Sequence, residues 1–106
     1  MSKHLRRAID NLMQRLIALS ARVEESVRLA IEAVKQSDSA LAGQVIEMDD
    51  IIDQEEIDIE EECLKTLALH QPVAGDLRTI VAVLKINNDL ERIGDLSVDI
   101  AKHAIK

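Results

Sequence analysis

The sequence predicts an all-α fold, an up-down-up antiparallel three-helix bundle, and three observations support this prediction. The 106 residues include three Gly, one Pro and no Phe, Tyr or Trp, so the hydrophobic 47% is almost entirely aliphatic, which suits packing between helices. Apolar residues recur at intervals of three and four, as on a helix with one buried face. Two short polar breaks give three similar segments, and this length suits one domain, which we expect at residues 1–106.

The first helix is expected at about residues 3–36. Ser2 is a suitable N-cap, and the short polar side chains after Gln36 compete for backbone hydrogen bonds and end the helix. The residues expected to face the core are Leu5, Ile9, Leu12, Leu16, Leu19, Val23, Val27 and Val34.

The second and third helices are expected at about residues 39–70 and 73–104. Pro72 separates them, because proline disfavours helical geometry in the residue before it and suits the first turn of the next helix. The short connections force neighbouring helices to run antiparallel. The expected core positions are Leu41, Val45, Met48, Ile52, Ile59, Cys63 and Leu67 in the second helix, and Leu77, Ile80, Leu84, Ile86, Leu90, Ile93 and Ile100 in the third.

Carboxylates line one side of each of the last two helices, beside the apolar positions. Their spacing of three and four keeps each row on one helix face. If the chain folds back at Pro72, Asp49 lies at the same level along the two antiparallel helices as Asp95, and Asp53 at the same level as Glu91. The two rows are Asp49, Asp53, Glu56 and Glu60, and Glu91, Asp95 and Asp99.

Two facing rows of carboxylates repel each other, and a bound multivalent cation is the simplest way to offset that repulsion. All-oxygen carboxylate sites accept magnesium, calcium, manganese, iron or zinc with modest discrimination. The alternative is that the acidic rows are ordinary solvated helix surface. The candidate metal ligands are Asp49, Asp53, Glu91 and Asp95, followed by Glu24, Glu56 and Asp99.

Several functional classes find no support in the sequence. A net charge of −7 and the lack of aromatic residues argue against nucleic-acid binding. There is no Glu-x-x-His metal motif, Gly-rich phosphate loop or nucleophile with a base, so we expect no enzymatic activity. The lone Cys63 fits a reducing cytoplasm, and charges interrupt every apolar stretch before it could span a bilayer.

A second set of apolar residues lies away from the expected core. Ile46, Ile57 and Leu64 form a separate line on the second helix, while Val81 widens the apolar arc of the third. Exposed apolar patches of this kind mark protein interfaces, although extra core breadth would produce the same pattern. We therefore expect a partner protein or a second copy of the chain.

The run from Gln71 to Arg78, followed by Leu84, Lys85 and the segment 89–95 (DLERIGD), resembles the signature of the PhoU family of bacterial phosphate-signalling regulators. The stretch from Val45 to Cys63 also resembles the second helix of that family. The resemblance covers nearly the whole chain, and the first helix is its least distinctive part.

The resemblance implies one three-helix repeat of a family whose members usually have two. It also implies a metal site with Asp49, Asp53, Glu91 and Asp95 as ligands, because such repeats hold iron or zinc clusters in some members. The expected role is the regulation of phosphate uptake and phosphate-starvation signalling through a Pst-type phosphate transporter and a PhoR-type sensor kinase. The chain would then be cytoplasmic and would reach the membrane only through its partners. As a single repeat it would be a fragment, an excised domain, or a chain that forms a dimer or other homo-oligomer to restore the pair, and the second apolar lines favour pairing. The alternative is a metal-free helical interaction module.

Overall fold

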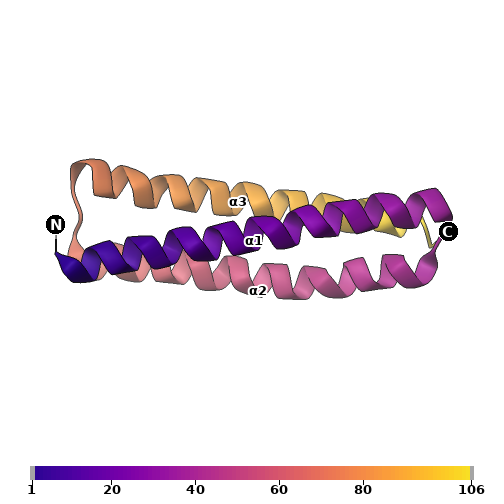
Figure 1. Ribbon diagram of the computed structural model, residues 1–106, viewed down its shortest axis with the longest axis horizontal. Helices are drawn as coiled ribbons and strands as arrows, with labels where there is room; N and C mark the ends of the chain where they lie inside the picture. The colour runs from indigo at the N-terminus through magenta and orange to yellow at the C-terminus, as the bar shows by residue number, and fades with distance from the viewer. Residues whose placement is uncertain (1, 106) are drawn as a thin grey trace.

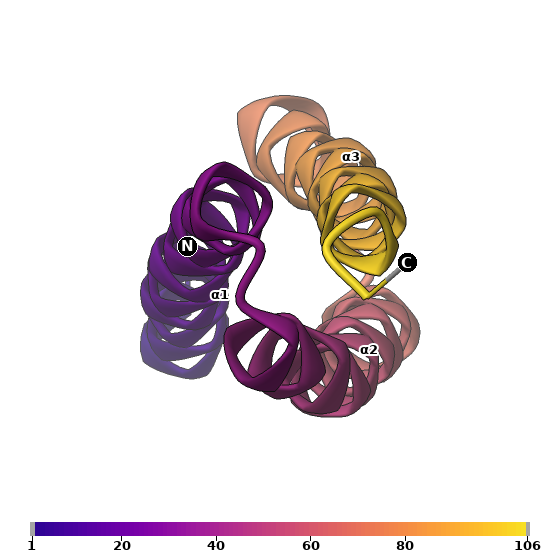
Figure 2. The ribbon, with the colours of Figure 1, turned by 90° about the vertical axis from the view of Figure 1, so that its right-hand side faces the viewer.

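The computed structural model describes residues 2–105 and contains three long helices, α1 (Lys3–Gln36), α2 (Ser39–His70) and α3 (Ala74–Lys102). They lie side by side in an elongated bundle of 52 × 18 × 16 Å (Figure 1). Figure 2, seen along the bundle, shows that the helices form a triangle in which each contacts the other two. The predicted all-α, antiparallel three-helix fold is confirmed. The domain expected at residues 1–106 includes Met1 and Lys106, which lie outside the described residues.

Local side-chain and backbone contacts define the helix ends. The Ser2 hydroxyl accepts a hydrogen bond from the Leu5 amide at 3.1 Å, and the Asp38 carboxylate accepts one from the Leu41 amide at 3.0 Å. Ser37 and Gln71 end α1 and α2 in the left-handed conformation, with φ of 52° and 46°. α3 ends two residues earlier than expected, because the Ala104 amide donates to the Ala101 carbonyl in a tighter turn.

The buried residues of each helix follow a regular three-four spacing, and we call this row of positions the seam. Its regularity is that of helices packed side by side in a bundle. Large aliphatic side chains fill one part of the core, and a second cluster is rich in alanine. The buried residues are Leu5, Leu12, Leu16, Leu19, Val23, Ser26, Ala30 and Ala33 in α1, Ala42, Val45, Ile52, Ile59, Cys63 and Thr66 in α2, and Ile80, Val83, Asn87, Leu90, Gly94, Ser97 and Ala101 in α3.

Four residues expected in the core are instead exposed, and for these the sequence-based expectation was wrong. In three cases a small or polar neighbour occupies the seam instead, namely Ala33 in α1 and Asn87 and Gly94 in α3. The fourth residue lies near the start of α3, before Ile80, the first buried residue of that helix. Choosing the largest apolar side chain in each turn therefore led away from the seam. The exposed residues are Val34, Leu77, Ile86 and Ile93.

The polar residues of the seam bond to one another or to the backbone. The hydroxyl groups of Ser26 in α1 and Ser97 in α3 lie 2.8 Å apart and are fully buried. Asn87 donates from Nδ2 to the Glu56 carbonyl at 2.9 Å, which ties α3 to α2. These hydrogen bonds offset part of the cost of burying polar atoms, while Oδ1 of Asn87 is buried without a partner among the described residues. No helix among residues 2–105 combines the length and apolar character needed to cross a membrane.

Replacing Gly43 by alanine is expected to raise the free energy of unfolding by about 0.5–1 kcal/mol, because alanine favours helix and the added Cβ would meet no atom within 4 Å. Gly94→Ala should give little or none of this gain, since its Cβ would lie 3.3 Å from Ile52 Cγ2 and 3.4 Å from Asp49 Oδ1. Urea unfolding followed by circular dichroism, in the presence of a chelator, measures the free energy of unfolding of both variants. Equal stabilisation by the two variants would mean that Ile52 and Asp49 move aside without cost.

Candidate metal centre

Two carboxylates of α2 occupy seam positions that are otherwise apolar. The buried residues Val45, Ile52 and Ile59 are seven apart, and Asp49 and Glu56 stand between them at the alternate positions of the same row. Both are only partly buried. The packing of α2 thus draws two ionisable groups toward the interior of the bundle, next to α3.

Three carboxylates from α2 and α3 converge at this point. One oxygen from each of Asp49, Asp53 and Asp95 lies within 4.8 Å of the other two. Oδ1 of Asp49 is buried and has no hydrogen-bond partner. Gly94 lies against Asp49, and its missing side chain leaves room for the carboxylate. We call Asp49, Asp53 and Asp95 the acidic triad.

Glu91 and Glu56 border the acidic triad. Burial raises the pKa of Glu91, and the nearby charges of Asp95, Glu56 and Asp53 raise it further. Burial also raises the pKa of Glu56, with a smaller effect from the charges of Glu60 and Asp53. Both glutamates therefore experience the negative potential of the cluster.

The strongest effect falls on Asp49. Its pKa is raised to about 6 by burial and, to a smaller extent, by the charges of Asp53, Asp95 and Asp50. Burial and the charges of Asp95 and Asp50 also raise the pKa of Asp53. Within residues 2–105 the ion pairs are Arg22–Glu55 and Arg28–Glu25, so no Lys or Arg neutralises the triad. The site combines an unpartnered buried oxygen with uncompensated negative charge, and a cation would relieve both.

The structure groups most, but not all, of the residues considered from the sequence. Asp49, Asp53 and Asp95 meet directly, while Glu91 and Glu56 lie at the edge of the triad. The two remaining candidates, Glu24 of α1 and Asp99 of α3, are exposed and lie outside it.

Sequence reasoning missed the contribution of Gly94 and Asn87. Gly94 makes space for Asp49, and Asn87 holds the backbone of Glu56 from the facing helix. Both residues lie on the three-four row of α3, seven residues apart, and this spacing was the signal in the sequence that they face the core. It was overlooked because neither residue is hydrophobic.

Without metal, the protein is expected to become more stable as the pH falls from 7 to about 5. Burial and like charges raise the pKa of Asp49 in the folded chain to about 6, above its ordinary value in the unfolded chain, so the folded chain takes up a proton at a higher pH than the unfolded chain does. The raised pKa values of Asp53, Glu56 and Glu91 act in the same direction. Thermal unfolding with a chelator at several pH values measures this trend. A fall in melting temperature from pH 7 to pH 5 would contradict it.

The substitution Asp49→Asn should stabilise the metal-free protein at pH 7 by about 1 kcal/mol, because it removes a charge that burial and like charges disfavour. It should also weaken the pH dependence. Glu47→Gln is the matched control, since Glu47 is exposed on the same helix and is not among the charges that raise the pKa of Asp49. Both variants can be compared with the parent by urea unfolding at pH 7 and pH 5. Equal effects of the two substitutions would argue against a special environment at Asp49.

Known proteins resemble this chain over nearly its full length. Residues 16–104 match the family model described as the PhoU domain. The chain is 42% identical over 97 residues to the phosphate-specific transport system accessory protein PhoU homolog of Aquifex aeolicus, covering 92% of this chain and 44% of that protein. It is 42% identical over 105 residues to the homolog of the same name from Pseudomonas aeruginosa, covering 99% of this chain and 43% of that protein.

A solved structure gives the same result. The crystal structure of PhoU from Pseudomonas aeruginosa superposes with a TM-score of 0.91 and 43% identity, over 94% of this chain and 48% of the crystallised one. The chain therefore spans less than half the length of these relatives. The family match and the identity over more than 90 residues lead to one conclusion. This chain belongs to the PhoU family.

Proposed function

We propose that this chain is an accessory regulator of phosphate uptake and phosphate-starvation signalling, which binds a metal ion at the acidic triad. Family membership supports the first part of the proposal, since the relatives are named as accessory proteins of a phosphate-specific transport system. The convergence of Asp49, Asp53 and Asp95 on one point carries the second part.

The ligands that we propose are Asp49, Asp53 and Asp95, with Glu91 and Glu56 available at the edge of the site. An all-oxygen set suits magnesium, calcium, manganese and iron better than zinc, whose protein sites are rich in histidine and cysteine. A bound cation would supply positive charge to the unpartnered Asp49 oxygen and draw α2 and α3 together. Within the described residues no histidine or cysteine belongs to the group.

We propose that the protein acts by binding rather than catalysis. Its partners would be a Pst-type phosphate transporter and a PhoR-type sensor kinase, and it would work in the cytoplasm, beside the membrane that holds them. Cys63 offers no reactive alternative, because burial raises the pKa of its thiol to about 11 and keeps it neutral.

A second candidate function is a metal-free interaction module whose acidic helix serves only to keep it soluble. The charge of α2 favours this alternative, since that helix has ten Asp and Glu against one Lys, and such rows are common on solvated helices. The two candidates differ in whether the acidic triad holds a metal.

Elemental analysis of untagged protein purified without chelator should find a stoichiometric metal. The double variant Asp49→Asn with Asp95→Asn should lose it while keeping its helical circular dichroism, because two of the three converging carboxylates are gone. Glu47→Gln with Glu61→Gln is the matched control, as it removes the same charge from exposed positions of α2. A parent protein free of metal, or a double variant with unchanged content, would leave the metal-free module as the function.

The regulatory role is tested in a bacterium that lacks its own PhoU protein and carries a phosphate-starvation reporter. Expression of this chain should lower the reporter signal in phosphate-rich medium. The double variant Asp49→Asn with Asp95→Asn should fail to do so, while the Glu47→Gln and Glu61→Gln control should behave like the parent. An unchanged signal with the parent chain at normal expression would exclude the regulatory role for this chain alone.

A further inference from the structure

One end of the bundle is basic, although the chain as a whole is acidic. This end contains the start of α1, the end of α2 and the start of α3 (Figure 1). Residues 2–7 and 65–78, which form it, include five Lys and Arg against one acidic residue, in a chain of net charge −7. All five basic residues are exposed. We call this end the basic tip, and its basic residues are Lys3, Arg6, Arg7, Lys65 and Arg78.

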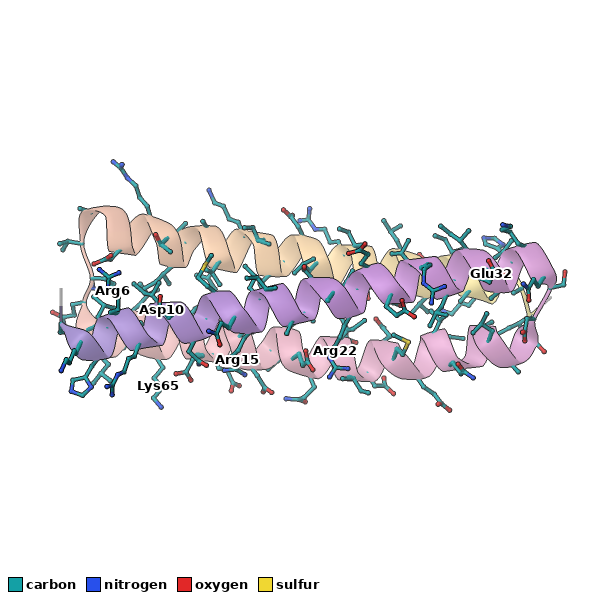
Figure 3. All side chains as sticks on the ribbon, viewed as in Figure 1. Arg6, Asp10, Arg15, Arg22, Glu32 and Lys65 are labelled. Carbon is teal, nitrogen blue, oxygen red and sulfur yellow. The ribbon has the colours of Figure 1, made fainter. Side chains whose placement is uncertain are left out.

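The basic residues of α2 and α3 lie at the same level along the bundle axis. Asn87 of α3 donates a hydrogen bond to the backbone of Glu56 in α2, and the two helices are antiparallel. Arg78, nine residues before Asn87, is therefore level with Lys65, nine residues after Glu56. Figure 3 places Lys65 and Arg6 at this same end, on two different helices.

α1 contributes a basic residue at that level too. The bond between Ser26 and Ser97 aligns α1 with α3, so Arg7, nineteen residues before Ser26, is level with Arg78, nineteen before Ser97. This level is about 6 Å from the start of α3 at Ala74, at 1.5 Å per residue. Long Lys and Arg side chains can extend over that distance. The three helices thus surround the tip with cations.

Aliphatic side chains project from the basic tip. Val73 and Leu69 are 75% and 69% exposed, the largest fractions among the exposed large apolar residues of the described chain. Val73 lies in the connection between α2 and α3, directly after the buried Pro72. The connection is therefore packed against the bundle through Pro72, while Val73 is presented to the outside.

We propose that the basic tip binds the surface of an anionic phospholipid bilayer. Lys and Arg would contact the phosphate groups of the lipids, while Val73 and Leu69 would enter the boundary between headgroups and acyl chains. The 52 Å axis of the bundle would then point away from the membrane. The inference goes beyond the proposed function, because it needs neither a metal nor a partner protein.

The arrangement of charge favours a bilayer over an acidic protein segment. A broad anionic surface can contact the cations of all three helices at once, whereas a single helix or strand would reach those of one or two. The acidic part of α2 is also set back, because residues 63–70 contain no Asp or Glu. Glu62 lies about 12 Å from the end of α2 at 1.5 Å per residue, beyond the Debye length of about 8 Å.

Sedimentation with vesicles tests the proposal, in a chelator so that no divalent ion bridges the acidic triad to lipid phosphate. The parent chain should bind vesicles made of equal parts of phosphatidylglycerol and phosphatidylcholine at physiological ionic strength. It should not bind vesicles of phosphatidylcholine alone, and high salt should weaken the binding. Arg7→Gln with Lys65→Gln should weaken it about 25-fold, since each basic residue near an anionic surface strengthens binding about fivefold.

The matched control is Arg92→Gln with Lys102→Gln, which removes the same charge from exposed positions of α3 that lie away from the tip. This variant should bind vesicles like the parent. All four altered residues are exposed, so the helical circular dichroism should stay the same.

A single tryptophan reports which part of the chain meets the lipid, because the sequence has no Phe, Tyr or Trp. The emission of Val73→Trp should shift to shorter wavelength when the anionic vesicles are added. Val34→Trp, at an exposed position near the other end of α1, should show no shift.

Three results would overturn the proposal. The parent chain could fail to sediment with the anionic vesicles, the control variant could lose as much binding as the tip variant, or the shift could occur at position 34 and not at position 73. If the parent ignores vesicles but the tip variant no longer lowers the phosphate-starvation reporter signal, the tip contacts an acidic protein instead. A chain that binds metal but no vesicles refutes only the bilayer contact and leaves the proposed function standing.

Discussion

The structure depends on how α2 packs against α3 with carboxylates on its seam. In a bundle of aliphatic residues, Asp49 and Glu56 stand where apolar side chains are otherwise buried. α3 accommodates them with Gly94, which leaves space, and Asn87, which bonds to the α2 backbone. The stability of this part of the core is therefore reduced by an unpartnered carboxylate oxygen. Such a loss is typical of a site that is completed by something from outside the chain.

The charge of the protein is unevenly distributed over its three helices. Most of the negative charge belongs to α2, while α1 has more basic than acidic residues. The α2 side of the bundle therefore favours cations. The side formed by α1 and α3 carries less negative charge and has exposed apolar residues such as Ile17 and Ile93. The acidic triad lies on this acidic side, where the local potential would favour the cation that we propose it binds.

Much of the fold could be predicted from the sequence, because the signals are local. Ser2 and Asp38 are N-caps in the structure, and the three-four spacing of aliphatic residues indicated three helices. The short connection at Pro72 leaves little freedom in how α2 and α3 align, so Asp49 and Asp95 could be expected to lie at the same level, and they do. The predicted core face of α3 was partly wrong, because Ile86 and Ile93 are exposed and Gly94 is buried. Hydrophobic size was a poor guide where close helix approach demands small residues.

The site was less predictable than the fold for a related reason. Spacing along a helix does not show how near a carboxylate comes to the facing helix, and so Glu24 and Asp99 were kept as less certain candidates behind Asp95. The position of each residue along the bundle and the rotation of each helix about its own axis separate them. That rotation is decided by contacts between helices, such as Asn87 with Glu56, which no single helix reveals in its own sequence.

The buried hydroxyl pair of Ser26 and Ser97 has a further consequence for how the bundle assembles. Sliding α3 along α1 by one helical turn, about 5.4 Å, would leave the Ser26 hydroxyl without its partner, at a cost of roughly 1–3 kcal/mol, while the Ser97 hydroxyl would keep its bond to the Gly94 carbonyl. The pair thus favours one alignment of α1 with α3, two helices that are not consecutive in the chain. Since Asp95 is two residues from Ser97, the same pair also fixes the position of the Asp95 carboxylate along the bundle axis. The metal site that we propose would then be organised in advance and would spend little of its affinity on rearrangement.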